Sequence, residues 1–303
     1  MSEDRWLAEA LAGLGGEAGD GVVLGPGDDA AVLVPGTTGC VVTTDALVDG
    51  VHFDLASCGP QAAARKAIGV NLSDLAAMGA RPRALVVSAV LPRPVERALF
   101  DGLVAGLREA AAAWDCPLVG GDTNSADGPL VLAVTALGDA PPAGAVTRSG
   151  GRAGDVLSVT GPLGGSLAGR HLTPTPRLDA GRVLAGGDGA APIAHAMMDI
   201  SDGLSRDLPR LARASGVGAT LVAEQIPIHA DAGGSLEAAL HDGEDFELLV
   251  AHAPLDAEAE ARLATVGVQL VAVGRLEDEA GVRIERGGRI EPLPARGFDH
   301  LAG

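Results

Sequence analysis

Short apolar runs with the composition of β-strands alternate with longer runs of helical periodicity, and this alternation extends along most of the chain. In the first half, the strand-like run 40–48 precedes a helix-like run over 61–79, and the strand-like run 83–92 precedes a helix-like run that opens with Pro94. The second half repeats the pattern, with residues 164–172 as one of its expected helices. The pattern predicts the α/β (α+β) class, in which each β-sheet layer is backed by helices on one side.

A stretch rich in Pro and Gly at residues 141–155 interrupts the alternation and is typical of a linker. A chain of 303 residues is long enough for two domains, and its 47% hydrophobic content is sufficient for two cores. We therefore predict two α/β domains, residues 1–140 and residues 141–303.

The charge of the chain argues against several classes of partner. Its formal net charge is -18 at pH 7, so most of its surface would repel a nucleic-acid backbone or an anionic membrane. The three cysteines, Cys40, Cys58 and Cys116, favour buried thiols in a reducing compartment over a disulfide framework or a zinc site. No apolar run approaches the roughly 20 residues that span a bilayer. We expect a cytoplasmic protein that binds neither nucleic acid nor membranes.

Lys66 is the only lysine in the chain, which restricts how the protein could bind phosphates. A P-loop needs a lysine directly after a glycine, whereas Lys66 stands in the run ARKAIG. Nothing in the sequence resembles the catalytic loop of protein kinases. If the protein binds polyphosphates, metal ions and arginines must neutralise them, and the metal ions require carboxylates.

Carboxylates recur where an apolar run ends in a glycine turn or a hydroxyl-rich step. Taken singly, each could form a turn or begin a helix. Taken together, several acids at one edge of a fold would repel each other unless they share hard cations such as Mg2+. The neighbouring hydroxyl groups of Thr43 and Thr44 could add oxygen ligands. The acids concerned are Asp28, Asp29, Asp45, Asp74, Asp122, Asp199, Asp202, Glu244 and Asp245.

The segment MMDISDG at residues 197–203 leaves two interpretations open. Asp202 could cap a helix that begins after Gly203. That role leaves Asp199 unexplained, because a carboxylate beside two methionines and Ile200 is costly to bury without a positive partner. From this segment alone, helix capping and metal binding are equally favoured.

Three further residues, and Glu244 among the acids above, have structural explanations beside functional ones. Arg148 follows a threonine in a glycine-bounded turn, where it could bind a phosphate or be solvated. Phe298 could stack on a flat cationic ring or fill the core beneath the last strand. His52 suits an ordinary edge position, and Glu244 would favour a cation over a phosphate as its neighbour.

A series of motifs resembles the thiamine-monophosphate kinase family, which belongs to a superfamily with aminoimidazole ribonucleotide synthetase and selenophosphate synthetase. The motifs are, in order, GPGDDAAVL, TTDALVDGVHF, ARKAIGVNLSDLAAMGARPRALVVSAVLP, LVGGDTN, TRSG, HLTPTPR, MDISDGLSRDL, GEDFELL and the closing GFDH. The resemblance covers essentially the whole chain. It implies an N-terminal domain that forms the interface of a homodimer, and a C-terminal domain that closes over a nucleotide cleft.

The resemblance also implies a reaction and its residues. The enzyme would use ATP to phosphorylate thiamine monophosphate to thiamine diphosphate, with several Mg2+ ions bound. Because such an acceptor is already largely a phosphate dianion at neutral pH, we expect direct in-line transfer with no side chain acting as nucleophile or base. At matching positions, the Mg2+ ligands would be Asp29, Thr43, Thr44, Asp45, Asp74, Asp122, Asp199 and Asp202. The residues that contact ATP would be Gly121, Asp122, Arg148 and Ser201. Those that contact thiamine monophosphate would be His52, Glu244 and Phe298.

The chain departs from the family pattern in two places. Asp242 stands where the family usually has glycine, which leaves the path of the loop before Glu244 open, and the segment between Gly165 and Ala194 is short. Two other functions remain as alternatives: an ATP-dependent synthetase that uses the same metal cleft on another acceptor, and a binding protein for nucleotides or divalent ions without turnover. Selenophosphate synthesis is disfavoured, because residues 1–26 contain neither cysteine nor lysine.

Overall fold

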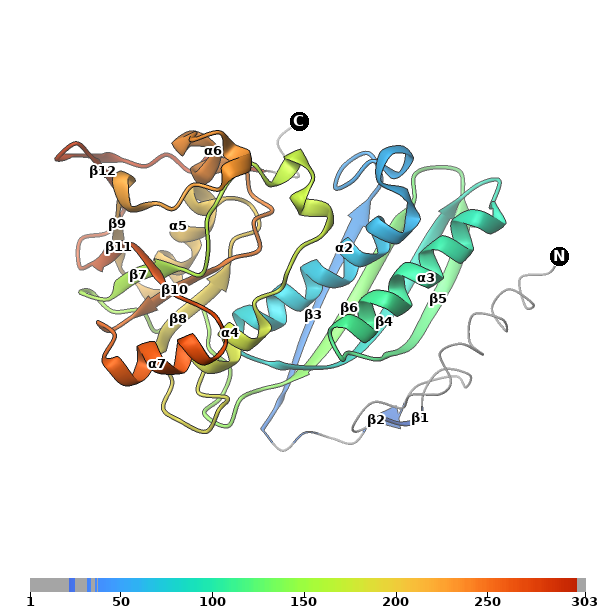
Figure 1. Cartoon of the computed structure of the whole chain (residues 1–303), viewed down its shortest axis with the longest axis horizontal. Helices are drawn as coiled ribbons and strands as arrows, with labels where there is room; N and C mark the ends of the chain where they lie inside the picture. Colours follow the sequence, from blue (N-terminus) through green and yellow to red (C-terminus); the bar gives the residue numbers. More distant parts are fainter. Residues whose placement is uncertain (1–21, 25–31, 34–35, 37, 299–303) are drawn as a thin grey trace. The chain divides into compact units, whose positions relative to one another are not determined.

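The computed structural model describes residues 22–24, 32–33, 36 and 38–298. The described residues form two compact units: unit 1 lies within residues 1–75 and 81–139, and unit 2 within residues 76–80 and 140–303. Figure 1 labels their helices and strands. None of the helices that the structure describes is both long enough and apolar enough to cross a membrane.

Unit 1 contains the strands β1 (Val22–Leu24), β2 (Val32–Leu33), β3 (Cys40–Val48), β4 (Arg81–Pro92), β5 (Leu118–Ala126) and β6 (Val131–Asp139). Four of them form one sheet in the order β3-β6-β4-β5, and β1 pairs separately with β2. β4 and β5 are parallel, whereas β6 is antiparallel to both β3 and β4. The strands of this sheet pair over most of their length, so the register fixes which residues share a face.

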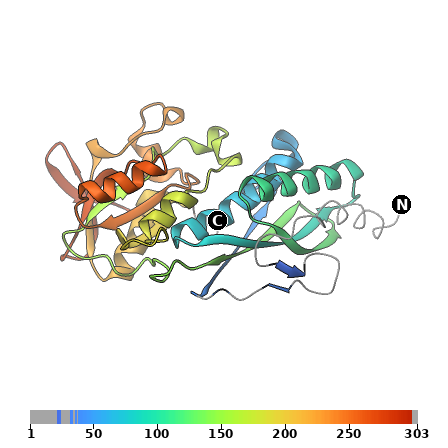
Figure 2. The same cartoon turned by 60° about the horizontal axis from the view of Figure 1, so that its bottom comes forward.

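Two helices, α2 (Leu55–Ala77) and α3 (Arg97–Ala113), cover one face of this sheet (Figures 1 and 2). Small residues let the two helices pack closely. A Cβ at Gly106 of α3 would lie 2.7 Å from the carbonyl oxygen of Gln61 in α2, which only a glycine avoids.

The two faces of the unit 1 sheet differ in burial. Successive residues of a strand point to opposite faces, and those on the helix side, such as Leu85 and Val134, are fully buried. The alternate residues include Val42 and Val86, which are 59% and 37% exposed. The sheet therefore has one core face and one partly apolar face that α2 and α3 leave uncovered.

Unit 2 contains the strands β7 (Val156–Val159), β8 (Ala194–Asp199), β9 (Gly218–Val222), β10 (Leu248–His252), β11 (Val271–Glu277), β12 (Val282–Arg286) and β13 (Arg289–Pro292). They form one sheet in the order β13-β12-β9-β11-β7-β10-β8. β12 is parallel to β9, and the other neighbouring pairs are antiparallel.

Helices lie on both faces of this sheet. They are α4 (Leu178–Leu184), α5 (Leu204–Ser215), α6 (Leu236–His241) and α7 (Ala257–Thr265), with short 3-10 turns at η1 (Ser166–Ala168), η2 (Arg170–Leu172), η3 (Ala223–Gln225) and η4 (Ala230–Ala232). Leu208 of α5 and Leu240 of α6 belong to one core, whereas Leu184 of α4 and Leu263 of α7 belong to another. The expectation that helices back each sheet on one side is wrong for unit 2, because β8 and β10 are buried on both faces.

The helix expected over residues 164–172 is also replaced by other structure. This segment forms η1 and η2, with backbone φ angles of 87° at Gly164, 72° at Gly165 and 140° at Gly169. These positive φ angles interrupt an α-helix, and glycine adopts them without steric cost.

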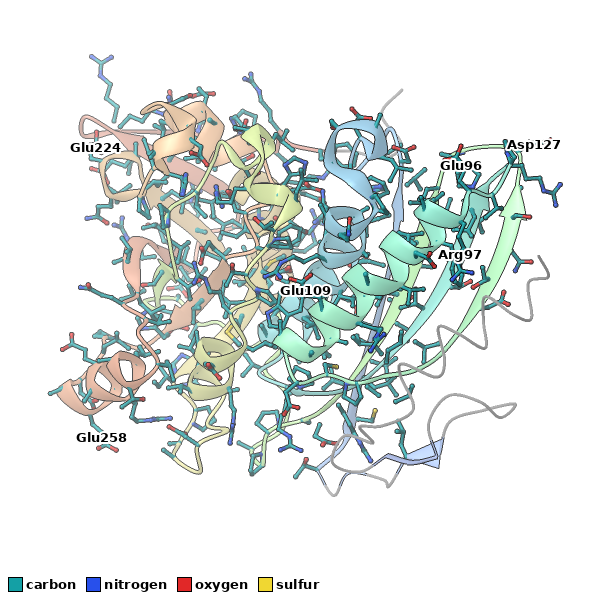
Figure 3. The ribbon with its side chains drawn as sticks, turned by 45° about the vertical axis from the view of Figure 1, so that its right-hand side comes forward. Glu96, Arg97, Glu109, Asp127, Glu224 and Glu258 are labelled. Atoms are coloured by element: carbon teal, nitrogen blue, oxygen red, sulfur yellow. The ribbon has the colours of Figure 1, made fainter. Side chains whose placement is uncertain are left out.

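The outer surfaces carry many acidic side chains, in keeping with the net charge of -18. In unit 1, Glu96 and Asp127 point away from the ribbon, as do Glu224 and Glu258 in unit 2 (Figure 3).

Candidate active site

In unit 1, the structure brings Thr43, Asp45 and Asp74 together between β3 and α2. The hydroxyl group of Thr43 donates a short hydrogen bond to Oδ2 of Asp74. The backbone N–H of Asp45 donates to Oδ1 of Asn71, 3.0 Å away, and Asn71 lies one helical turn before Asp74 on α2. Thr43 and Asp45 share the helix-facing side of β3, because they are two residues apart. Oxygen atoms of β3 and of α2 thus lie close together on the helix side of the unit 1 sheet.

The predicted ligands Thr44 and Asp122 lie on the opposite face of the same sheet. Thr44 Oγ1 donates to the carbonyl oxygen of Val134 at 3.0 Å and accepts from Thr135 Oγ1 at 3.1 Å. Asp122 pairs with Ser88 in the strand register and accepts a 2.6 Å hydrogen bond from Asn124 Nδ2. Within unit 1, these two side chains are therefore separated by the sheet from Thr43, Asp45 and Asp74.

Gly121 has a packing reason to be glycine. A Cβ at this position would lie 2.3 Å from the carbonyl oxygen of Val87 on the neighbouring strand β4. Real Cβ atoms do not approach an oxygen so closely, so a side chain here would push β4 and β5 apart. Asp122 is the next residue of β5 and so directly follows this close contact.

His52 lies in the loop after β3, and the only lysine of the chain holds that loop. His52 Nδ1 accepts from the backbone N–H of Val48 at 3.0 Å, and the ammonium group of Lys66 donates a hydrogen bond to the His52 carbonyl oxygen. Lys66 is fully buried. Its charge therefore acts inside unit 1, which agrees with a structural role rather than a P-loop role.

In unit 2, a buried aspartate shapes the turn that follows β8. The backbone N–H groups of Ser201 and Asp202 both donate to Oδ2 of Asp207, each at 3.0 Å. Asp207 lies in the first turn of α5 and is fully buried. Burial is the main cause that raises its pKa to about 6, followed by the charge of Asp202. Asp199, at the end of β8, is itself only 4% exposed.

Asp202 does not cap α5. The N-cap residue is Gly203, without a side-chain capping bond, and the carboxylate of Asp202 instead lies 2.6 Å from Arg210 Nη2 and 3.8 Å from Arg206 Nε. The capping interpretation of Asp202 is therefore wrong. The carboxylate that accepts backbone N–H groups here belongs to Asp207, which the sequence analysis did not select.

Two distant parts of the chain meet this turn through backbone hydrogen bonds. The N–H of Glu244 donates to the Ser201 carbonyl oxygen at 2.7 Å, and the N–H of Phe298 donates to the Asp202 carbonyl oxygen at 3.2 Å. A Cβ at Gly297 would lie 2.2 Å from that same Asp202 oxygen, so glycine permits the approach. Ser201, Asp202, Glu244 and Phe298 are therefore neighbours in unit 2.

Arg148 lies in a segment that covers the free edge of β8, the last strand of its sheet. The backbone N–H of Met197 in β8 donates to the Thr147 carbonyl oxygen at 3.0 Å, and Ser215 Oγ donates to the Arg148 carbonyl oxygen at 2.9 Å. The Arg148 side chain is exposed. Its backbone is thus fixed at the edge of β8 and at the end of α5, while its guanidinium group reaches solvent.

The donor atoms in both units suit Mg2+. Among the residues that the structure describes, no group of three or more histidine, cysteine or acidic side chains could by itself hold a metal ion. Mg2+ bound to a nucleotide needs only one or two carboxylates, because phosphate oxygens and waters complete its coordination. Asp74 with the hydroxyl group of Thr43 in unit 1, and Asp199 and Asp202 in unit 2, supply such hard oxygen donors.

Comparison with known proteins assigns the chain to a family. Residues 27–140 match the N-terminal domain of the AIR synthase related proteins, and residues 152–287 match the C-terminal domain. A thiamine-monophosphate kinase of Rhodopirellula baltica is 38% identical over 299 residues, 92% of each chain. The crystal structure of thiamine-monophosphate kinase from Stenotrophomonas maltophilia K279a has a TM-score of 0.78 at 34% identity, and the match covers 93% of this chain and 94% of that chain. The chain belongs to the thiamine-monophosphate kinase family.

A third relative adds ligands to the comparison. The structure described as AaThiL complexed with AMPPCP and TMP has a TM-score of 0.76 at 28% identity, over 99% of both chains. Membership of the thiamine-monophosphate kinase family and the α/β class predicted from the sequence are therefore confirmed. The roles of individual residues stay predictions, and Asp29 lies outside the residues that the structure describes.

The departure from the family pattern at Asp242 has a clear structural result. Asp242 adopts the helical conformation at the end of α6, and its Oδ2 accepts a 2.9 Å hydrogen bond from the N–H of Gly165. The next residue, Gly243, adopts a left-handed conformation with φ 71°. The aspartate thus ties the loop before Glu244 to the segment that contains η1.

Asp245 is expected to make the stability of the protein depend on pH. Burial, as the main cause, raises its pKa to about 6 from 3.8. Because the folded protein binds this proton more tightly than the unfolded chain does, the contribution is fully present below the unfolded pKa and is lost as the pH rises through 6. The free energy of unfolding of the wild type relative to Asp245→Asn should fall by about 1 kcal/mol between pH 5 and pH 7. Urea unfolding of both proteins at the two pH values measures this difference, and an unchanged difference would contradict it.

Proposed function

We propose that the protein transfers the γ-phosphate of ATP to thiamine monophosphate and so forms thiamine diphosphate. The observation that carries the proposal is the meeting of Glu244 and Phe298 with the turn of Ser201 and Asp202. Residues assigned to the acceptor and residues assigned to ATP thereby share one small region of unit 2. The names of the relatives, and the presence of AMPPCP and TMP in AaThiL, support the same reaction.

The proposed roles follow the positions of the family motifs. Mg2+ ions would bind the hard oxygen donors of both units, and the guanidinium group of Arg148 would bind a phosphate. Glu244 would face the positive charge of the thiazolium ring, where a carboxylate is favourable. The ring of Phe298, 41% exposed, offers a surface on which a flat cation can stack. The proposed Mg2+ ligands are Asp29, Thr43, Thr44, Asp45, Asp74, Asp122, Asp199 and Asp202.

We propose direct in-line transfer without a covalent intermediate. The acceptor is a phosphate monoester whose second pKa lies near ~6, so at neutral pH it is already largely a dianion. No general base is needed to remove a proton. The main obstacle is repulsion between two charged phosphates, which bound cations and correct positioning overcome.

One experiment tests both the reaction and its route. The purified protein is incubated with γ-labelled ATP and Mg2+, with thiamine monophosphate, with thiamine, with an aminoimidazole precursor, or without acceptor. We expect label in thiamine diphosphate only, and no labelled protein when the acceptor is omitted. Release of labelled inorganic phosphate that depends on the aminoimidazole precursor would favour the synthetase alternative, and ATP binding without any transfer or release of label would favour a binding protein. Stoichiometric label on the protein would refute direct transfer.

Activity is expected to rise with free Mg2+ after all ATP has already been converted to MgATP. The chain has no exposed lysine ammonium to neutralise phosphates, because its only lysine is buried. Further cations must therefore compensate the acceptor and the transferred phosphoryl group. Initial rates at constant MgATP and increasing free Mg2+ measure this dependence. A rate that follows the MgATP concentration alone would rule it out.

The quaternary structure and the domain division belong to this proposal as well. The face of the unit 1 sheet that carries Val42 and Val86 is partly apolar and exposed, which supports its use as the interface of a homodimer. The domains would be residues 1–140 and 141–303, and the enzyme would act in the cytoplasm. Sedimentation equilibrium of the purified protein measures its association state.

A further inference from the structure

Two residues in the loop that carries Glu244 have a strained backbone. The φ angles of Glu244 and Phe246 are 52° and 53°, in the left-handed region that side chains other than glycine rarely adopt. Such conformations cost of order 1–3 kcal/mol each and persist only where surrounding structure enforces them. Backbone bonds from Glu244 N–H to Ser201 and from Phe246 N–H to Ile200 supply part of this enforcement.

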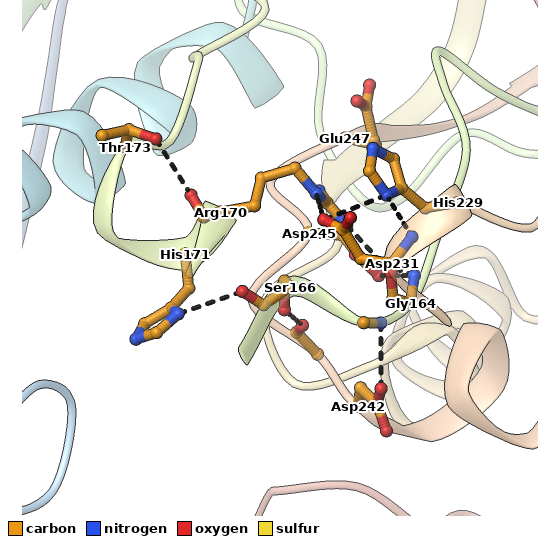
Figure 4. Close-up of polar contacts among 12 residues, drawn as sticks. Gly164, Ser166, Arg170, His171, Thr173, His229, Asp231, Asp242, Asp245 and Glu247 are labelled. Carbon is orange, nitrogen blue, oxygen red and sulfur yellow. Dashed lines mark hydrogen bonds and ion pairs between the residues drawn. The ribbon is translucent and has the colours of Figure 1, made fainter. Parts of the chain in front are cut away.

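The residue between these two, Asp245, is held by a second segment of unit 2. Its carboxylate accepts the N–H of Gly164 at 2.9 and 3.1 Å and lies 3.0 Å from Arg170 Nη2 (Figure 4). The carboxylate of Asp245 is 1% exposed, whereas Arg170 is 24% exposed and also lies 3.7 Å from Asp231. Gly164 and Arg170 flank η1, so this ion pair joins the η1 segment to the strained loop.

Glu247, two residues after Asp245, forms a similar ion pair, with Arg177. It is 4% exposed, and its Oε2 accepts from Thr160 Oγ1 at 2.6 Å and from Arg177 Nε at 2.8 Å. A second bond from Arg177 Nη2 to Oε1 makes the pair bidentate. The bond with Glu247 is the main cause of the raised pKa of Arg177. Bidentate pairs of this kind fix orientation as well as distance.

From these contacts we propose that Asp245 and Glu247 are positioning residues, which hold Glu244 toward the thiamine monophosphate through their ion pairs with Arg170 and Arg177. The inference rests on the proposed function. The two ion pairs fix Asp245 and Glu247, the residues on either side of Phe246. Loss of either pair should therefore let the strained backbone relax. The turn that carries Ser201 and Asp202 has its own support in the carboxylate of Asp207, which accepts the backbone N–H groups of both residues. The loop of Glu244 and the turn of Ser201 share backbone hydrogen bonds, but the side-chain carboxylates that hold each of them are different.

Steady-state kinetics separate this role from a general structural one. In Asp245→Asn and in Glu247→Gln, we expect the KM for thiamine monophosphate to rise about 10-fold, because a misplaced carboxylate loses attraction for the acceptor cation. The kcat and the KM for ATP should stay within about twofold of wild type, because Asp207 still holds the ATP-side turn. Arg177→Lys keeps the positive charge without the bidentate fork, so it should give a smaller rise in the same KM.

The chain offers a matched control in Asp188→Asn. Asp188 forms a bidentate pair with Arg262 at 2.9 Å for each bond, elsewhere in unit 2. This variant removes the same kind of ion pair without touching the loop of Glu244. Its KM values and kcat are expected to equal those of wild type.

Hydrogen exchange tests the positioning without any substrate. The amides of Glu244 and Phe246 should exchange about 10-fold faster in Asp245→Asn and Glu247→Gln than in wild type or Asp188→Asn, because local opening is easier. Unchanged exchange in both variants would overturn the proposal. A parallel loss of kcat and of ATP affinity would overturn it too, since that pattern indicates general disruption. If the wild type transfers no phosphate to thiamine monophosphate, the proposed function fails, while the exchange comparison still decides whether the ion pairs hold the loop.

Discussion

Asp199→Asn is expected to fold normally and to turn over about 1000-fold more slowly than wild type, because it removes a negative charge from the proposed Mg2+ site. Asparagine has almost the same shape as aspartate, so the packing of Asp199 at the end of β8 should be retained. The measurements are kcat at saturating ATP and thiamine monophosphate, and the thermal unfolding midpoint. A fall in kcat with an unchanged midpoint is the expected result.

A surface control completes that experiment. Asp278 is an exposed acid in the loop after β11, so Asp278→Asn changes the net charge equally without reaching the site. It should have the kcat of wild type. Near-normal activity of Asp199→Asn at limiting Mg2+ would show that Asp199 is not a metal ligand.

Asp207→Ala should destabilise the protein more than Asp199→Asn does, and should lower the free energy of unfolding by about 3 kcal/mol. The substitution leaves the N–H groups of Ser201 and Asp202 without their acceptor. It also removes the partner of Arg210 Nη1, which lies 2.7 Å from Asp207 Oδ1. Urea unfolding followed by circular dichroism measures the loss.

Asp207→Asn serves as the comparison for this prediction. It keeps one side-chain oxygen that can accept from the turn, so its loss of stability should be about half as large. Equal stability of Asp207→Ala and wild type would mean that water replaces the carboxylate in the turn.

The class of fold could be predicted from the sequence because the alternation of strand-like and helix-like runs is a local property. The placement of helices on both faces of the unit 2 sheet was missed, although the runs HAMMDI and FELLVAH contain the signal. A run of consecutive apolar residues in a strand indicates burial on both faces, and residues 196–198 of β8 and 248–251 of β10 behave in this way. The lack of alternation between apolar and polar residues in these strands predicts a core on each face of the unit 2 sheet.

The error over residues 164–172 has a different origin. Composition favoured a helix, but the segment is fixed by distant partners: Gly164 by Asp245, Gly165 by Asp242, and Ser166 by the Gly243 carbonyl oxygen. Contacts between segments about 80 residues apart leave no periodic signal in either one. Only the glycines at positions of positive φ indicated that a helix would be interrupted.

The candidate site was partly predictable for similar reasons. The period of two along β3 would have separated Thr43 and Asp45 from Thr44, since adjacent strand residues face opposite sides. Asp207 was overlooked because an acid in the first turn of an amphipathic helix usually faces solvent, and the sequence alone does not show that this one is buried.

The burial of Lys66 has a practical consequence for chemical probes of unit 1. Amine-reactive reagents modify side-chain ammonium groups that reach solvent, and the one such group in this chain is fully enclosed and bonded to the His52 carbonyl oxygen. Acylation at position 66 therefore requires that unit 1 open around α2. The rate of that modification can be measured by mass spectrometry of the arginine-cleaved peptides. It reports, at one site, how often the loop that carries His52 opens.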